Sequence, residues 1–95
     1  MTRYITLLKF TDRGARALRK SSARASAFGK AAKKAGVTVE GLYWTTGSYD
    51  GVLILRAANA QRALRCLARL AGAGNVTTET LQAFDEREFK AIVGN

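Results

Sequence analysis

The sequence predicts a small α+β domain in which one four-stranded antiparallel sheet carries two helices on a single face. Four segments have the alternating or β-branched pattern of strands, and two long segments have helical periodicity. They follow one another in the order βαββαβ, with one more short helix at the end. This order is the split βαβ, or ferredoxin-like, arrangement.

The first strand is expected over residues 3–10, which carry apolar side chains on both faces. The helical region that follows begins at the N-cap signal Thr11-Asp12 and stops at Gly36, a residue suited to the left-handed position past a helix end. Its apolar residues change phase at Ser21-Ser22. We therefore expect the helix to bend or restart there.

A hairpin is expected next, because residues 37–45 and 49–57 are rich in β-branched and aromatic side chains and flank the turn Thr46-Gly47-Ser48. Glycine takes a positive φ without a Cβ clash, so Gly47 suits a tight reversal. The turn should place the polar side chains that follow it at the rim of the sheet.

The second half of the chain predicts a helix, a strand and a final helix. The first helix is capped by Asn59 and ends near Gly72, the threonine-rich strand covers residues 75–84, and Asp85 caps a helix over residues 86–93. The helix after Asn59 is amphipathic. Its apolar face carries Ala60, Ala63, Leu64, Leu67 and Leu70, and its other face carries Arg62, Arg65 and Arg69.

Length and composition exclude several classes of protein. With 95 residues, of which 47% are hydrophobic, residues 1–95 form a single domain, and so small a core favours oligomerisation. We expect a cytoplasmic protein, because no apolar run approaches the ~20 residues of a membrane span and the first residues lack a signal-peptide pattern.

The chain has no histidine and one cysteine, Cys66, so we expect no metal and no cofactor. Cys66 is either a thiolate activated by the neighbouring Arg65 or a partly buried, inert thiol.

The formal charge of +9 raises nucleic acid or another polyanion as a partner. Eight basic residues lie between positions 13 and 34, where Asp12 is the only neighbouring acid. These residues form either the solvated outer face of a helix or an anion-binding surface. The third strand, Val52–Leu55, is aliphatic and lacks the aromatic residues of RNA-binding sheets, which leaves only non-specific phosphate contact.

One face of the predicted sheet has no helix to cover it. We expect this face to pack against a second subunit, because an exposed apolar face would otherwise promote aggregation. Any cavity should lie between the two sheets or under the helices. The residues expected on the uncovered face are Leu7, Leu42, Trp44, Val52 and Ile54.

The candidate site residues surround the hairpin turn. Asp50 is the candidate catalytic residue, as an acid, a base or the partner of a ligand amine, and it is equally suited to anchoring the turn through backbone amides. Tyr49 either offers its phenol to a ligand or packs its ring. Tyr43 and Trp44 must lie on opposite faces of their strand, so only one of them can enter a cavity between subunits.

Three segments of the chain closely resemble the GYD domain family: YITLLKFT (residues 4–11), GLYWTTGSYD (41–50) and GNVTTETLQAF (74–84). The triad that gives the family its name matches Gly47, Tyr49 and Asp50, with Ser48 between the first two. This resemblance implies a bacterial or archaeal protein with a ferredoxin-like fold assembled as a dimeric α+β barrel. It implies no established biochemical activity.

The chain is more distantly similar to RAM, the effector-sensing domain of the leucine-responsive (Lrp/AsnC) regulators. The similarity rests on the strand order, the Gly-x-Tyr-Asp hairpin and the segment Asn75–Thr80. In those regulators small amino-acid effectors bind at oligomer interfaces near the hairpin. The similarity therefore implies a sensing role for this chain.

Three functions follow from these observations. The first is a homo-oligomeric module that binds a small anionic or zwitterionic metabolite near Trp44, Thr46, Gly47, Tyr49 and Asp50. The second is a cofactor-independent enzyme of the dimeric α+β barrel kind, similar to monooxygenases or isomerases, with Asp50 as acid or base; this alternative rests on fold analogy. The third is non-specific polyanion binding through the basic helices.

Overall fold

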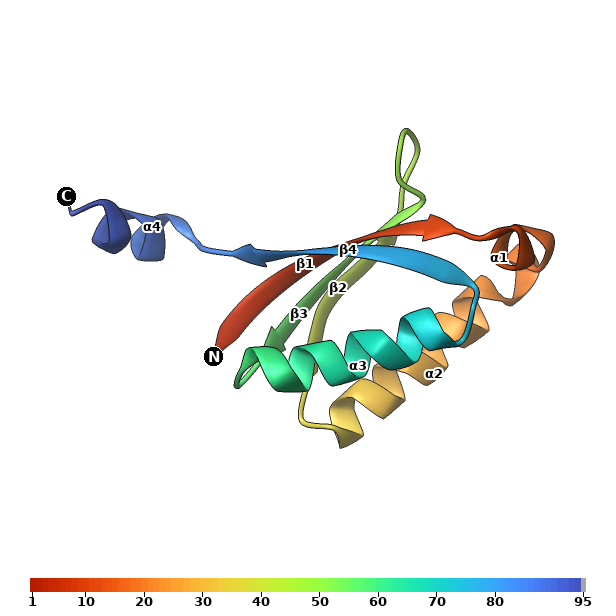
Figure 1. The fold of residues 1–95 in the computed structure, drawn as a ribbon, viewed down its shortest axis with the longest axis horizontal. Helices are drawn as coiled ribbons and strands as arrows, with labels where there is room; N and C mark the ends of the chain where they lie inside the picture. Colours follow the sequence, from red (N-terminus) through yellow and green to blue (C-terminus); the bar gives the residue numbers. More distant parts are fainter. Residues whose placement is uncertain (95) are drawn as a thin grey trace.

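The computed structural model describes residues 1–94, which form one antiparallel sheet with strand order β2-β3-β1-β4. Helices α2 and α3 lie on the same side of this sheet and leave the other side open (Figure 1). The structure confirms the predicted order of elements. Their bounds are β1 Thr2–Phe10, α1 Asp12–Arg16, α2 Ser21–Lys34, β2 Thr38–Trp44, β3 Gly51–Ala57, α3 Ala60–Gly72, β4 Val76–Ala83 and α4 Glu86–Val93.

The first helical region is divided as its sequence predicts. The Thr11 hydroxyl accepts a hydrogen bond from the Gly14 N–H at 3.1 Å, so that Thr11 caps α1. A short 3-10 turn, Leu18–Lys20, separates α1 from α2, which starts at Ser21 where the apolar phase changes. Gly36 follows α2 with a φ of 78°.

Strand β2 contains a β-bulge that the sequence pattern does not reveal. Val39 lies opposite Leu55 on β3, but the next paired residue is Gly41, opposite Ile54, so Glu40 is an extra residue. An extra residue inverts the alternation of side chains beyond it, because the side-chain period of a strand is two. All side chains of β2 after Glu40 therefore change face.

The bulge makes one expectation about the open face wrong. Leu42 lies opposite Leu53 and Trp44 opposite Gly51, so both side chains lie on the helix-covered face, where Leu53 is buried. Tyr43 faces the open side instead. Leu7, Val52 and Ile54 lie on the open face as predicted.

Charged side chains on the open face hold the bulged residue. Arg3 Nε donates to Glu40 Oε1 at 2.8 Å, and Arg56 Nη1 lies 3.7 Å from Glu40 Oε2. Arg3 and Arg56 are direct neighbours on β1 and β3. Glu40 therefore lies between two guanidinium groups, and the hydrogen bond from Arg3 lowers its pKa below the ordinary 4.5.

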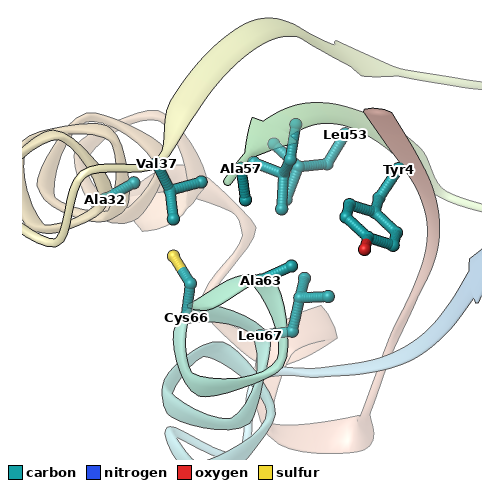
Figure 2. Close-up of a cluster of buried hydrophobic side chains, with 9 residues drawn as sticks. Tyr4, Ala32, Val37, Leu53, Ala57, Ala63, Cys66 and Leu67 are labelled. Carbon is teal, nitrogen blue, oxygen red and sulfur yellow. The ribbon is translucent and has the colours of Figure 1, made fainter. Parts of the chain in front are cut away.

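The core lies between the sheet and the two covering helices (Figure 2). The helices contribute mainly small residues to it, which lets them approach the sheet closely. The one buried polar side chain within residues 1–94, Thr6, is paired with the Thr80 hydroxyl at 2.9 Å, as burial requires. The buried residues are Tyr4, Ala32, Val37, Leu53, Leu55, Ala57, Ala63, Cys66 and Leu67.

The structure differs from the sequence prediction in two places, the start of β3 and the exposure of one α3 residue. Strand β3 begins at Gly51, two residues later than predicted, because Tyr49 and Asp50 belong to the turn. Leu64, expected on the buried face of α3, is 67% exposed. Asn59 caps α3 as predicted, and no helix within residues 1–94 is long and apolar enough to span a bilayer.

Gly14 in α1 tests how closely this helix packs against Asn75, the residue before β4. A Cβ built on Gly14 would overlap the Asn75 carbonyl oxygen, whereas one on Gly29 in α2 would meet no atom within 4 Å. We expect Gly14→Ala to lower the free energy of unfolding by about 1–3 kcal/mol or more. The matched Gly29→Ala should raise it by about 0.5–1 kcal/mol, because alanine favours a helix. Urea unfolding measures the free energy of unfolding of both variants. Equal changes in the two would contradict the close packing of Gly14 against Asn75.

Acid titration tests the ion pairs at the bulge. Because Arg3 lowers the pKa of Glu40 in the folded chain, the stabilisation by Glu40 is present above about pH 4.5 and is lost as the pH falls through the folded pKa. Between about pH 3 and pH 6, the free energy of unfolding should therefore depend less on pH for Glu40→Gln than for the unsubstituted chain. An identical slope would mean that the ion pairs contribute nothing.

Candidate functional site

A cavity of about 360 Å³ lies at one end of the covered face of the sheet. Its floor is the end of β1, the end of β2 and the start of β3, and its walls are the first half of α2 and the last turn of α3. Most of its lining is apolar, and the main apolar side chains are Leu8, Phe10, Phe28, Leu42, Trp44 and Leu70. Ser21, Arg24, Asp50, Arg69 and Asn75 add polar groups.

Trp44 enters this cavity because of the bulge at Glu40. Without the extra residue, normal alternation after Val39 would direct Trp44 to the open face. Its side chain remains 52% exposed, which places it at the mouth of the cavity. The indole therefore has one surface toward the cavity and one toward solvent.

Two arginines supply the positive charge of the cavity. Arg24 donates to the Ala17 carbonyl oxygen at 3.2 Å and to Ser21 Oγ at 3.3 Å, which fixes its guanidinium at the start of α2. Arg69 projects from the last turn of α3. Within residues 1–94, neither guanidinium has a carboxylate at ion-pair distance. Both retain N–H donors for an anion.

Asp50 fixes the hairpin to the first strand. Its Oδ2 accepts a hydrogen bond from the Phe10 N–H at 2.8 Å, and its own N–H donates to the Leu8 carbonyl oxygen at 2.8 Å. The Asp50 carbonyl oxygen also accepts from the Thr45 N–H at 2.9 Å. The side chain is half-buried and borders the cavity. The anchoring role is therefore present in the structure, beside a position that a ligand can reach.

Tyr49 extends toward the open face, away from the cavity. Its hydroxyl donates to Glu79 Oε1 on β4 at 3.1 Å, and Lys9 Nζ lies 5.9 Å from the centre of its ring. The hydrogen bond to Glu79 raises the pKa of the Tyr49 hydroxyl above its usual 10.0. Tyr49 is consequently a neutral phenol at physiological pH and is not a base.

The remaining predicted site residues lie at the exposed tip of the turn. Thr46 and Gly47 do not line the cavity, and Gly47 has the positive φ, 101°, that the tight turn was predicted to need. The Thr45 hydroxyl donates to the Tyr49 carbonyl oxygen at 2.7 Å and closes the turn. The structure thus brings together Trp44 and Asp50 and separates them from the other predicted residues.

The cavity also uses residues that sequence reasoning did not select. Arg24 and Phe28 are four positions apart on α2, a spacing that places them on one helix face. That spacing was visible in the sequence, but the face of the helix that meets the sheet was not. Arg69 and Leu70 join the cavity because the end of α3 lies beside α2.

Cys66 is a buried, inert thiol. Only 5% of it is exposed, and burial raises the pKa of the thiol, an effect larger than the lowering by Arg69. The alternative of an activated thiolate is not supported. Residues 1–94 contain no cluster of three or more histidine, cysteine or acidic side chains that would hold a metal ion.

A helix-covered four-stranded sheet with an apolar cavity at one end defines a small α+β domain with ferredoxin-like strand order. The family model described as the GYD domain matches residues 4–93, so this chain belongs to the GYD domain family. The resemblance carried by the hairpin and by strands β1 and β4 is thereby confirmed.

A solved structure supports the fold. The crystal structure of TTHA0845 from Thermus thermophilus is similar to this chain with 25% sequence identity and a TM-score of 0.50. The match covers 90% of this chain and 95% of that chain. A search of curated proteins gives no match.

Substitutions at Asp50 measure the anchoring contribution. We expect Asp50→Ala to lower the free energy of unfolding by about 1–3 kcal/mol, because the half-buried Phe10 N–H loses its acceptor. Asp50→Asn keeps an acceptor oxygen and should cost less than Asp50→Ala. Ser48→Ala, on the exposed tip of the same turn, is the control and should stay within about 0.5 kcal/mol of the original chain in urea unfolding. Equal stabilities for all three variants would contradict the anchoring role.

Proposed function

We propose that this GYD domain protein is a homo-oligomeric module that binds a small, largely apolar metabolite with an anionic or zwitterionic end. The observation that carries the proposal is the cavity beside Trp44. Its volume of about 360 Å³ falls in the ~300–1,000 Å³ range typical of small-molecule sites. Such sites combine an apolar wall with a few polar groups, as this one does.

The distribution of charge around the cavity suggests how a ligand would lie. An apolar body would rest against Phe28, Leu42 and Trp44, and a carboxylate would accept hydrogen bonds from Arg24 and Arg69. Hydrogen bonds between charged groups are stronger than those between neutral groups, so these arginines would orient the ligand. In a zwitterion, an ammonium group would meet Asp50 Oδ1, the carboxylate oxygen not used by the Phe10 N–H.

The separation of Asp50 from Tyr49 favours binding over acid–base catalysis. Asp50 borders the cavity and is occupied by a backbone amide, whereas Tyr49 reaches Glu79 over the opposite face of the sheet. A cofactor-independent enzyme with Asp50 as acid or base would therefore have Trp44, and not Tyr49, to shape its pocket. A binding role does not need the Asp50 carboxylate to be free of the Phe10 N–H.

The open face of the sheet supports the homo-oligomeric part of the proposal. Leu7, Val52 and Ile54 form an apolar centre there, and Tyr43 and Leu81 beside it are 59% and 48% exposed. A contiguous apolar face of this kind marks an interaction surface. A second copy of the chain would cover it.

Fluorescence of Trp44, the single tryptophan, tests the binding site without a label. We expect octanoate to change the emission of Trp44 saturably, because its chain fits the apolar wall and its carboxylate meets the arginines. Arg24→Gln or Arg69→Gln should weaken octanoate binding about tenfold, the effect of losing one charge-assisted hydrogen bond. Both variants should bind uncharged octan-1-ol with the same affinity as the original chain.

Lys30→Gln is the matched control, since Lys30 is exposed on α2 and does not line the cavity. This variant should bind octanoate as the original chain does. If neither probe changes the Trp44 emission saturably, the cavity is not a site for an amphipathic carboxylate. An equal loss in the Lys30 variant would show that only the overall charge matters.

A further inference from the structure

The C-terminal helix α4 presents an apolar face that its own chain leaves uncovered. Phe89, Ile92 and Val93 are 59%, 61% and 49% exposed, and no residue of α4 is buried. Their spacing of three and four places them on one side of the helix. Figure 1 shows α4 beyond the end of the sheet, away from α2 and α3.

Local chemistry defines α4 as a helix but does not make it stable alone. The Asp85 carboxylate accepts from the Glu88 N–H at 2.8 Å, the Glu88 side chain accepts from the Asp85 N–H at 2.9 Å, and Gly94 ends the helix with a φ of 81°. Isolated helices shorter than about 12–15 residues are marginal in water. An eight-residue helix with these caps therefore needs a packing partner.

A groove of matching character lies between α3 and β4. Its volume is about 250 Å³, below the usual range for small-molecule sites and suited to a few inserted side chains. Alanines on α3 leave it hollow, and the exposed Leu64 forms part of its wall. The groove residues are Ala60, Ala63, Leu64, Leu67, Ala68 and, from β4, Thr78 and Thr80, with Tyr4 at the base.

The exposed area points to a second copy as the partner. A compact folded monomer of this mass exposes about 5,400 Å², whereas this chain exposes 6625 Å². The surplus of about 1,200 Å² exceeds the ~800 Å² that each partner contributes to a standard interface. The radius of gyration, 14.1 Å, also exceeds the roughly 12 Å expected of a compact chain of this length.

Charge complementarity favours the same partner. Residues 85–94 carry three acidic and two basic side chains, whereas residues 1–84 carry four acidic and fourteen basic ones. Asp85, Glu86 and Glu88 lie together at the start of α4. The exposed Arg62 and Arg65 lie on the other face of α3, away from the groove, so the complementarity is one of net charge and not of paired residues. The acidic end of α4 thus complements the rest of this chain.

We propose that α4 of one copy packs into the groove between α3 and β4 of a second copy, with Phe89, Ile92 and Val93 facing Leu64 and Ala68. The segment Phe84–Asp85 continues away from the sheet, and Asp85 is extended with a ψ of 176°, so α4 leaves its own body. Reciprocal exchange between two copies covers both apolar surfaces at once. The contact is independent of ligand binding in the cavity beside Trp44.

Disulfide trapping between two full-length chains tests this contact. Both chains carry Cys66→Ala, which removes the native thiol; one also carries Val93→Cys and the other Ala68→Cys. An internal bond is then impossible. After mild oxidation of the mixture we expect the mixed disulfide to exceed either homodisulfide by on the order of tenfold, because docking raises the effective concentration of the two thiols.

Ser26→Cys, exposed on α2 and outside the groove, replaces Ala68→Cys in the control mixture and should give only background cross-linking. Light scattering of chains with the native cysteine provides a second measurement. Phe89→Asp should weaken self-association and leave the circular dichroism of the folded body unchanged, since Phe89 is outside the core. Mixed disulfide at the background level would overturn the proposal, and this is also the result expected if α4 folds back onto the groove of its own chain. Unchanged self-association of the Phe89 variant would overturn it as well.

Discussion

The β-bulge at Glu40 determines which side chains each face of the sheet presents. Strand β2 would otherwise alternate without interruption, and Trp44 would lie on the open face while Tyr43 lay under the helices. The extra residue is held by Arg3 and Arg56, which lie side by side on the two neighbouring strands. The aromatic wall of the cavity therefore depends on an ion-pair cluster on the opposite face.

The Gly-x-Tyr-Asp turn divides its polar side chains between the two sides of the sheet. Asp50 joins the start of β3 to β1 through Phe10 and Leu8, while Tyr49 crosses to Glu79 on β4 over the open face. Both residues therefore link the hairpin to the rest of the sheet. The turn positions Trp44 and the cavity floor, and this architectural role explains why adjacent polar residues do not form one pocket.

Predictions from the sequence succeeded where short-range chemistry decides the structure. Thr11, Asn59 and Asp85 each accept a hydrogen bond from an N–H three residues later, so the starts of α1, α3 and α4 were predictable from local residues. The bulge was not predictable in this way, because Glu40 is stabilised by Arg3, which is distant in the sequence. Leu42 and Trp44 were assigned to the wrong face for this reason, and the cavity could not be located from the hairpin alone.

A strongly basic chain that associates with itself must overcome repulsion between its copies. At +9 per chain this repulsion is long-ranged at low salt and is screened within about 8 Å at physiological ionic strength. The acidic residues are few, and several of them lie outside the basic helices: Glu40 and Glu79 on the open face, and the start of α4. On the open face Glu40 and Glu79 offset part of the positive charge of Arg3, Arg56 and Lys9, and the start of α4 brings three acidic side chains to the other proposed contact. Neither contact involves helix α2, whose exposed Lys30, Lys33 and Lys34 remain in solvent.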